Sequence, residues 1–84
     1  MKRTAIHVAG FDTTAQAEGA WRNGTRVKKR NSRRDDIHRD GAPGTVRGSI
    51  GAPGFGYGYF IEWDDLPGLP SFCASARLAK IEHH

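Results

Sequence analysis

The chain has 84 residues, of which 37% are hydrophobic and 26% are charged, and its formal net charge is +4 at pH 7. This length allows one small domain with one modest core. The sequence has no apolar run of the roughly 20 residues that a membrane span needs and no stretch typical of a secretory signal, so we expect a cytoplasmic protein that does not enter a membrane. Cys73 is the single cysteine, which excludes an internal disulfide and a zinc site built on paired cysteines.

Residues 1–23 predict an arm that precedes the main domain. Residues 4–8 favour a short strand. Thr13 is followed three residues later by glutamine, as in a capping box, and the alanines after it favour one or two helical turns over residues 13–20. Trp21 is expected to pin this arm to the domain, because a large ring buries much area for little entropy.

From Gly24 onward, short segments that alternate apolar and polar residues are separated by glycine and proline, a pattern typical of β-strands joined by turns. We expect strands over residues 24–29, 45–50, 59–64 and 71–75, then a tight turn at Leu78–Ile81 that leads into a short last strand. The alternation places five apolar residues inside the sheet, namely Val27, Val46, Ile50, Ile61 and Leu78.

The tetrapeptide Gly-Ala-Pro-Gly occurs twice, at residues 41–44 and 51–54. Counted from the alanine, proline at the second position and glycine at the third fit a type II turn, so each copy predicts a turn. The second copy is expected to open a glycine-rich loop over residues 51–58 that carries Phe55 and Tyr57.

Four motifs follow one another at strand spacing: Gly24-x-x-Val27, Gly41-x-x-Gly44-x-Val46, Tyr59-x-Ile61-x-Trp63-Asp64-Asp65 and Leu78-x-x-Ile81. Over residues 24–81 they resemble the small SH3-like barrels of the KOW and Tudor type. The resemblance implies a mainly β fold, a five-stranded antiparallel SH3-like barrel over residues 24–82 between the arm and a two-residue tail, residues 83–84. Such barrels bind RNA or DNA in ribosomal and transcription proteins and peptides in Tudor-like relatives, so the ligand stays open. The Arg-rich loop, residues 30–41, is longer than is usual in KOW domains.

A basic block occupies residues 22–47, where nine Lys and Arg side chains accompany three Asp. Such a block indicates a surface for a polyanion, of which nucleic acid is the commonest in a cytoplasm, although the Asp residues could instead pair with neighbouring Arg in a solvated loop. The candidate nucleic-acid-binding residues are Arg26, Lys28, Arg30, Arg33, Arg34, Arg39 and Arg47, with Phe55 and Tyr57 as base-stacking candidates. Phe55 and Tyr57 could equally pin their loop to the domain, whereas Tyr59 and Trp63 are interpreted as core.

The segment over residues 30–41 is predicted to be mobile in the free protein, because seven polar residues precede its one apolar residue, Ile37. Ile37 would then be its single tether to the domain.

Catalytic interpretations are weaker. Asp64 and Asp65 are adjacent on a strand end, so their side chains should point to opposite faces and not form a dyad. Cys73 in a strand favours packing over nucleophilic chemistry, and His7 and His38 are isolated. We therefore expect no enzymatic activity, no metal site and no cofactor.

Two hypotheses of different classes remain. The first is a module that binds DNA or RNA with little sequence specificity. The second is a protein-interaction module that grips a peptide or another copy of itself through exposed strand edges, which would make a homo-oligomer. A ribonuclease toxin on a related barrel ranks third, because no base and acid are positioned for it. Salt dependence separates the first two, since phosphate binding weakens steeply with salt.

Overall fold

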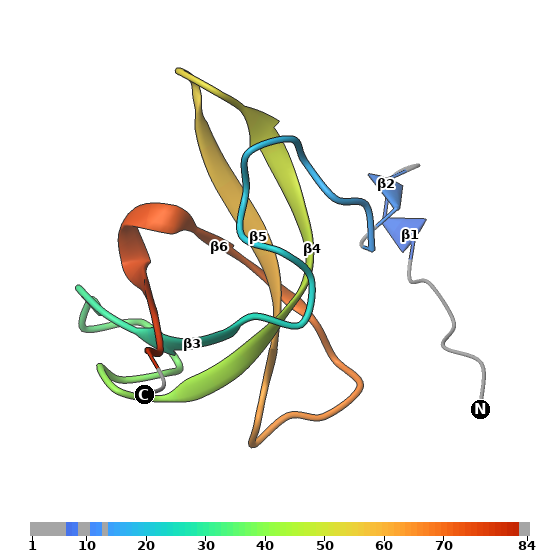
Figure 1. Cartoon of the computed structure of the whole chain (residues 1–84). Coiled ribbons are helices and arrows are strands. Elements are labelled where there is room, and N and C mark those ends of the chain that lie inside the picture. Colours follow the sequence, from blue (N-terminus) through green and yellow to red (C-terminus); the bar gives the residue numbers. More distant parts are fainter. Residues whose placement is uncertain (1–6, 9–10, 13, 83–84) are drawn as a thin grey trace.

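The computed structural model describes residues 7–8, 11–12 and 14–82, and its main element is one five-stranded antiparallel sheet. The strands are β3 (Arg26–Lys29), β4 (Pro43–Ala52), β5 (Gly56–Trp63), β6 (Ser71–Ala74) and β7 (Leu78–Lys80). They pair in the order β6-β5-β4-β3-β7, and a short 3-10 helix, η1 (Ser75–Arg77), connects the two outer strands. Figure 1 shows the long β4–β5 hairpin crossing the molecule with η1 beside it. The predicted mainly β fold with five antiparallel strands is thus confirmed, although no pairing in the described part of the chain closes the sheet between β6 and β7.

Outside this sheet, β1 (His7–Val8) and β2 (Phe11–Asp12) form a separate antiparallel pair. The strand expected over residues 4–8 is observed only as β1, and its remaining residues lie outside the described part. The tight turn expected at Leu78–Ile81 lies three residues earlier, in η1, because Leu78 already pairs with Lys29 as part of β7. In the described residues, no helix has the length and apolarity that crossing a membrane requires.

The core consists of six buried residues, Val27, Val46, Tyr59, Ile61, Trp63 and Leu78. Four of the five predicted core residues are therefore confirmed, as is the interpretation of Tyr59 and Trp63, but Ile50 is only half-buried. The reason is a β-bulge at Arg47: Val46 pairs with Ile61 and Gly48 with Phe60, so Arg47 is an extra residue. Alternation shifts by one position after the bulge, which turns Ser49 inward in place of Ile50.

The helical turns predicted over residues 13–20 are not observed: residues 14–20 contain turns and a bend but no helix, and residue 13 lies outside the described part. The backbone of the arm bonds to the sheet instead: Ala17 N donates to Ser49 Oγ at 2.9 Å, and Ser49 N donates to the Ala15 carbonyl at 2.8 Å. Trp21 stacks on Tyr59 with ring centroids 4.9 Å apart. Trp21 therefore is the predicted anchor, and the described residues 14–23 of the arm dock on the domain.

The two Gly-Ala-Pro-Gly copies differ in structure. The second forms the predicted type II turn, in which Phe55 N donates to the Ala52 carbonyl at 3.0 Å and Gly54 has φ +84°. However, residues 51–58 are mostly strand, so the expected glycine-rich loop is instead a tight β4–β5 hairpin. The first copy does not form the predicted turn, because the chain reverses at residues 39–42, which overlap only its first two residues, and β4 begins at its proline.

Ile61→Ala is expected to lower the free energy of unfolding by about 2–5 kcal/mol, because Ile61 is fully buried and the small core closes poorly over a cavity. Urea denaturation measures the change. Ile37→Ala is the matched control, since Ile37 is 85% exposed, and should change the free energy by no more than about 0.5 kcal/mol. Equal effects of the two substitutions would contradict this placement of the core.

Candidate nucleic-acid interface

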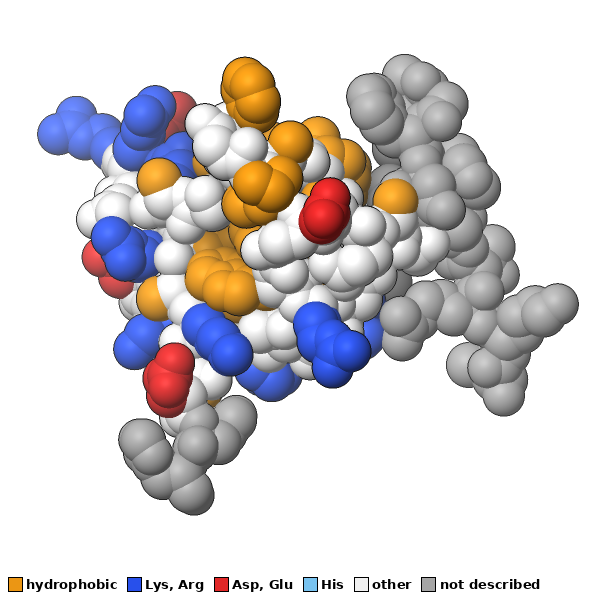
Figure 2. All heavy atoms as spheres, turned by 45° about the horizontal axis from the view of Figure 1, so that its top comes forward, with side chains coloured by type: hydrophobic (Ala, Val, Ile, Leu, Met, Phe, Trp, Pro, Cys, Tyr) orange, Lys and Arg blue, Asp and Glu red, His pale blue; other side chains and the backbone are white. Residues whose placement is uncertain are grey.

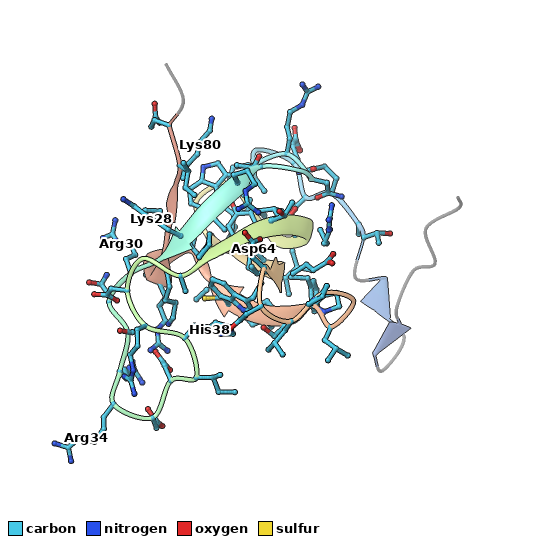
Figure 3. The ribbon with its side chains drawn as sticks, turned by 90° about the horizontal axis from the view of Figure 1, so that it is seen from below. Lys28, Arg30, Arg34, His38, Asp64 and Lys80 are labelled. Carbon is cyan, nitrogen blue, oxygen red and sulfur yellow. The ribbon has the colours of Figure 1, made fainter. Side chains whose placement is uncertain are left out.

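The outward positions of β3 carry cations, as the alternation predicted. Val27 and Lys29 are buried, whereas Lys28 and, just after the strand, Arg30 are exposed. β7 adds a further exposed cation, Lys80, because Val27 pairs with Lys80 across the two strands. Figure 3 shows Lys80, Lys28, Arg30 and, at the far end of the loop, Arg34 following one another along one side of the molecule. We call these four residues the cationic strip; Arg33, next to Arg34, is also exposed.

Two other predicted cations are engaged by acids of the protein itself. Arg26 forms a bidentate pair with Asp64, at 2.7 Å and 2.6 Å, and its hydrogen bonds lower the pKa of the Asp64 carboxyl. Arg47, the bulge residue, donates from Nε to Glu62 Oε1 at 2.7 Å. Both acids belong to β5 or to the turn after it, so this side of the sheet is largely neutralised.

Arg39 also has an internal role, because its guanidinium closes the β3–β4 loop. Its Nη1 and Nη2 atoms donate to the carbonyls of Arg33 and Arg34, each at 3.0 Å. Ser32 N donates to Asp40 Oδ1 at 2.8 Å and lowers the pKa of that carboxyl. These bonds count against the mobility expected for residues 30–41.

The Asp36 carboxylate connects the loop to the domain. It accepts hydrogen bonds from Lys29 Nζ at 2.8 Å, from Arg33 N at 2.7 Å and from the Arg77 guanidinium. These donors, Lys29 first, lower the pKa of Asp36 from 3.8 to about 2. Lys29 is only 6% exposed, so it supports the loop and is not available to a ligand.

The loop has a second attachment, but it is not the predicted Ile37, which is exposed. The His38 ring stacks on Trp63 with centroids 4.4 Å apart, and His38 Nε2 lies 2.8 Å from Asp65 Oδ1. Figure 3 shows His38 on the inner side of the loop. Asp64 and Asp65 thus contact different partners and form no dyad.

The two aromatic candidates have different surroundings. The Tyr57 hydroxyl donates to the Glu18 carbonyl at 2.8 Å, so Tyr57 helps to pin the arm. Phe55 is 90% exposed at the tip of the β4–β5 hairpin. Figure 2 shows hydrophobic side chains gathered on the face that carries this hairpin, with Lys and Arg at the margin. Neither aromatic residue belongs to the strands or the loop that carry the cationic strip.

A third aromatic residue, Phe72, was not among the predicted site residues. It lies on β6 and is 54% exposed, and its ring centroid lies 5.6 Å from that of Phe60. Its outward position follows from the alternation around Cys73, which packs against the core. Phe72 forms one wall of a hollow of about 550 Å³ between β6 and residues 35–38. We call this the loop–strand hollow.

Two observations concern metal binding and the cysteine. No group of three or more His, Cys, Asp or Glu side chains that could hold a metal ion occurs among them. Burial raises the pKa of the Cys73 thiol, which keeps it protonated and poorly nucleophilic near neutral pH.

Comparisons of this chain with protein-family models, with curated proteins and with solved structures found no match. The function of the interface therefore has to follow from its own geometry and charge.

Asp36→Asn is expected to destabilise the fold at pH 7, because Lys29 and Arg77 would keep their positions with less compensating charge. Folding lowers the pKa of Asp36 from 3.8 to about 2, so its contribution is present above the higher value and is lost as the pH falls through the lower one. The stability difference between wild type and variant should therefore be constant above about pH 5 and shrink toward pH 2, measured by urea denaturation.

Asp35→Asn changes an exposed carboxyl of the same loop and is the matched control, with little expected change at pH 7. A wild-type advantage over Asp36→Asn that stayed unchanged at pH 2 would contradict the role of Asp36.

Proposed function

We propose that the chain is a small SH3-like barrel of the KOW or Tudor type that binds nucleic acid and catalyses no reaction. The strand order β6-β5-β4-β3-β7, with η1 between the two outer strands, supports the barrel. A barrel requires these outer strands to approach each other, which a short connection such as η1 favours. The motifs that resemble KOW and Tudor barrels fall on these strands and on the turns between them.

The cationic strip is the observation that carries the nucleic-acid proposal. Lys28, Arg30, Arg34 and Lys80 extend along one side of the protein, and no ion pair within the described residues involves them. A row of unpaired cations neutralises successive phosphates and releases their counterions, which gives salt-dependent affinity. Arg26, Arg39 and Arg47 have partners in the protein and stand outside the proposed contact set.

The proposed binding has little sequence specificity, because flexible Lys and Arg side chains that contact phosphates do not read base edges. DNA and RNA both present such phosphates. A cytoplasmic location is part of the proposal and rests on the sequence alone.

Protein interaction is the second candidate, and the outer strand β6 favours it. Its four residues carry no charge, and an uncharged strand edge is open to pairing with another chain. Five large hydrophobic side chains are exposed in the described part of the protein, namely Ile37, Phe55, Leu66, Leu69 and Phe72. An apolar contact of this kind would tolerate salt.

Replacing Lys28 and Arg34 together by Gln is expected to weaken binding to a labelled oligonucleotide, measured by fluorescence anisotropy at about 50 mM and about 200 mM salt. The slope of log K against log salt should flatten by roughly 0.7 per lost contact on a single strand and 0.9 on a duplex. Both side chains are exposed, so the fold should persist.

Arg22→Glu is the matched control, because it lowers the net charge by the same two units at an exposed residue outside the strip. It should retain most of the affinity and the slope. Equal losses from both changes would point to net charge rather than to the strip. No binding by the wild type at low salt would overturn the nucleic-acid proposal in favour of protein interaction.

A further inference from the structure

The loop–strand hollow has walls of two kinds. Trp63, Leu66 and Phe72 form apolar surface on one side, and the loop adds Ile37 and His38. Lys29, Asp36 and Arg77 lie together at its lining and satisfy one another. A hollow of this size that combines aromatic and apolar walls with convergent polar groups is typical of a small-molecule site.

Phe72 is a fixed and accessible ring in this wall. A Cβ atom on Gly58, two residues before the pairing partner Phe60, would overlap the Phe72 ring, so the ring rests directly on backbone that only glycine leaves free. Phe60 supports the ring from the side in an edge-to-face contact. A ring that is held from beneath and open above is a platform on which a nucleobase can stack.

The charges around the hollow favour a base inside it and a phosphate outside it. Arg33 and Arg34 immediately precede residues 35–38, which form the loop wall, so two exposed cations adjoin this wall in the chain. Asp35 lies at that wall, is exposed and has no ion pair among the described residues, so its carboxylate repels a phosphate from the hollow. The same carboxylate can accept an N–H of a base.

We propose that the loop–strand hollow receives one unpaired nucleobase, which stacks on Phe72 while its flanking phosphates stay on the cationic strip. The ligand class is therefore single-stranded nucleic acid, because a base within a duplex is held in its stack and cannot enter a cavity without being extruded. This inference rests on the proposed function. An apolar peptide would gain nothing from the adjoining cations, which is why charge favours a nucleotide here.

The experiment compares three labelled probes with the same number of phosphates per strand: oligothymidine of about 12 nucleotides, an abasic strand and a duplex, titrated at low salt. Wild type should bind oligothymidine about five-fold or more tightly than the abasic strand, as one stacked base predicts. Phe72→Ala should abolish this preference and leave the affinity for the abasic strand unchanged. Phe55→Ala is the matched control, since it truncates an exposed ring at the hairpin tip and should keep the preference.

The two tryptophans locate the bound base independently of any variant. Trp63 lines the hollow, whereas Trp21 stacks on Tyr59 in the arm. In nuclear magnetic resonance spectra, oligothymidine should shift the indole N–H signal of Trp63 and leave that of Trp21 in place.

Three results would overturn the inference. Equal binding of oligothymidine and the abasic strand would show that no base enters the hollow. It would leave the phosphate-binding proposal intact. No binding of any probe would overturn both proposals. A wild-type dimer in sedimentation that Phe72→Ala converts to a monomer would show that a second copy covers the hollow.

Discussion

The Asp36 carboxylate joins three segments through its hydrogen bonds: Lys29 at the end of β3, the loop backbone at Arg33, and Arg77 in η1. Two of these donors are cations that the fold withdraws partly or almost wholly from water, so each needs the carboxylate to offset its lost hydration. The loop is therefore held against β3 and η1. Together with the Arg39 hydrogen bonds and the His38–Trp63 stack, the Asp36 carboxylate sets the position of Arg34 and of the loop wall of the hollow.

Local sequence patterns predict much of the sheet, because side-chain alternation and turn chemistry act over a few residues. The strands around Val27, Val46 and Ile61 follow from alternation alone. Ser49 and Ile50 do not, because one extra residue at Arg47 reverses every later position in β4 and the pattern contains no signal for it except the following glycine. The arm illustrates the same limit, since its helix-favouring residues form backbone bonds to β4 instead.

The candidate site is less predictable than the sheet. Its cations can be identified from the sequence, but the residues that neutralise or join them are distant in sequence. The basic block identifies the cations, yet whether each one is free depends on tertiary pairing. Asp64 neutralises Arg26 from 38 residues away, while Lys80 reaches the strip only through the pairing of β7 with β3. Sequence analysis therefore included Arg26 and missed Lys80.

The order of the strands determines which of these cations have an acidic partner. β5 and the turn after it supply Glu62 and Asp64, which neutralise cations on β4 and on the β4-facing part of β3. β7 lies on the other flank of β3 and supplies Lys80. A protein with a modest net charge thereby presents one strongly cationic flank, and a field of one sign on one side orients a polyanion before contact. Because Arg34 immediately precedes residues 35–38, which line the hollow, a strand guided along that flank arrives with its bases close to an apolar opening.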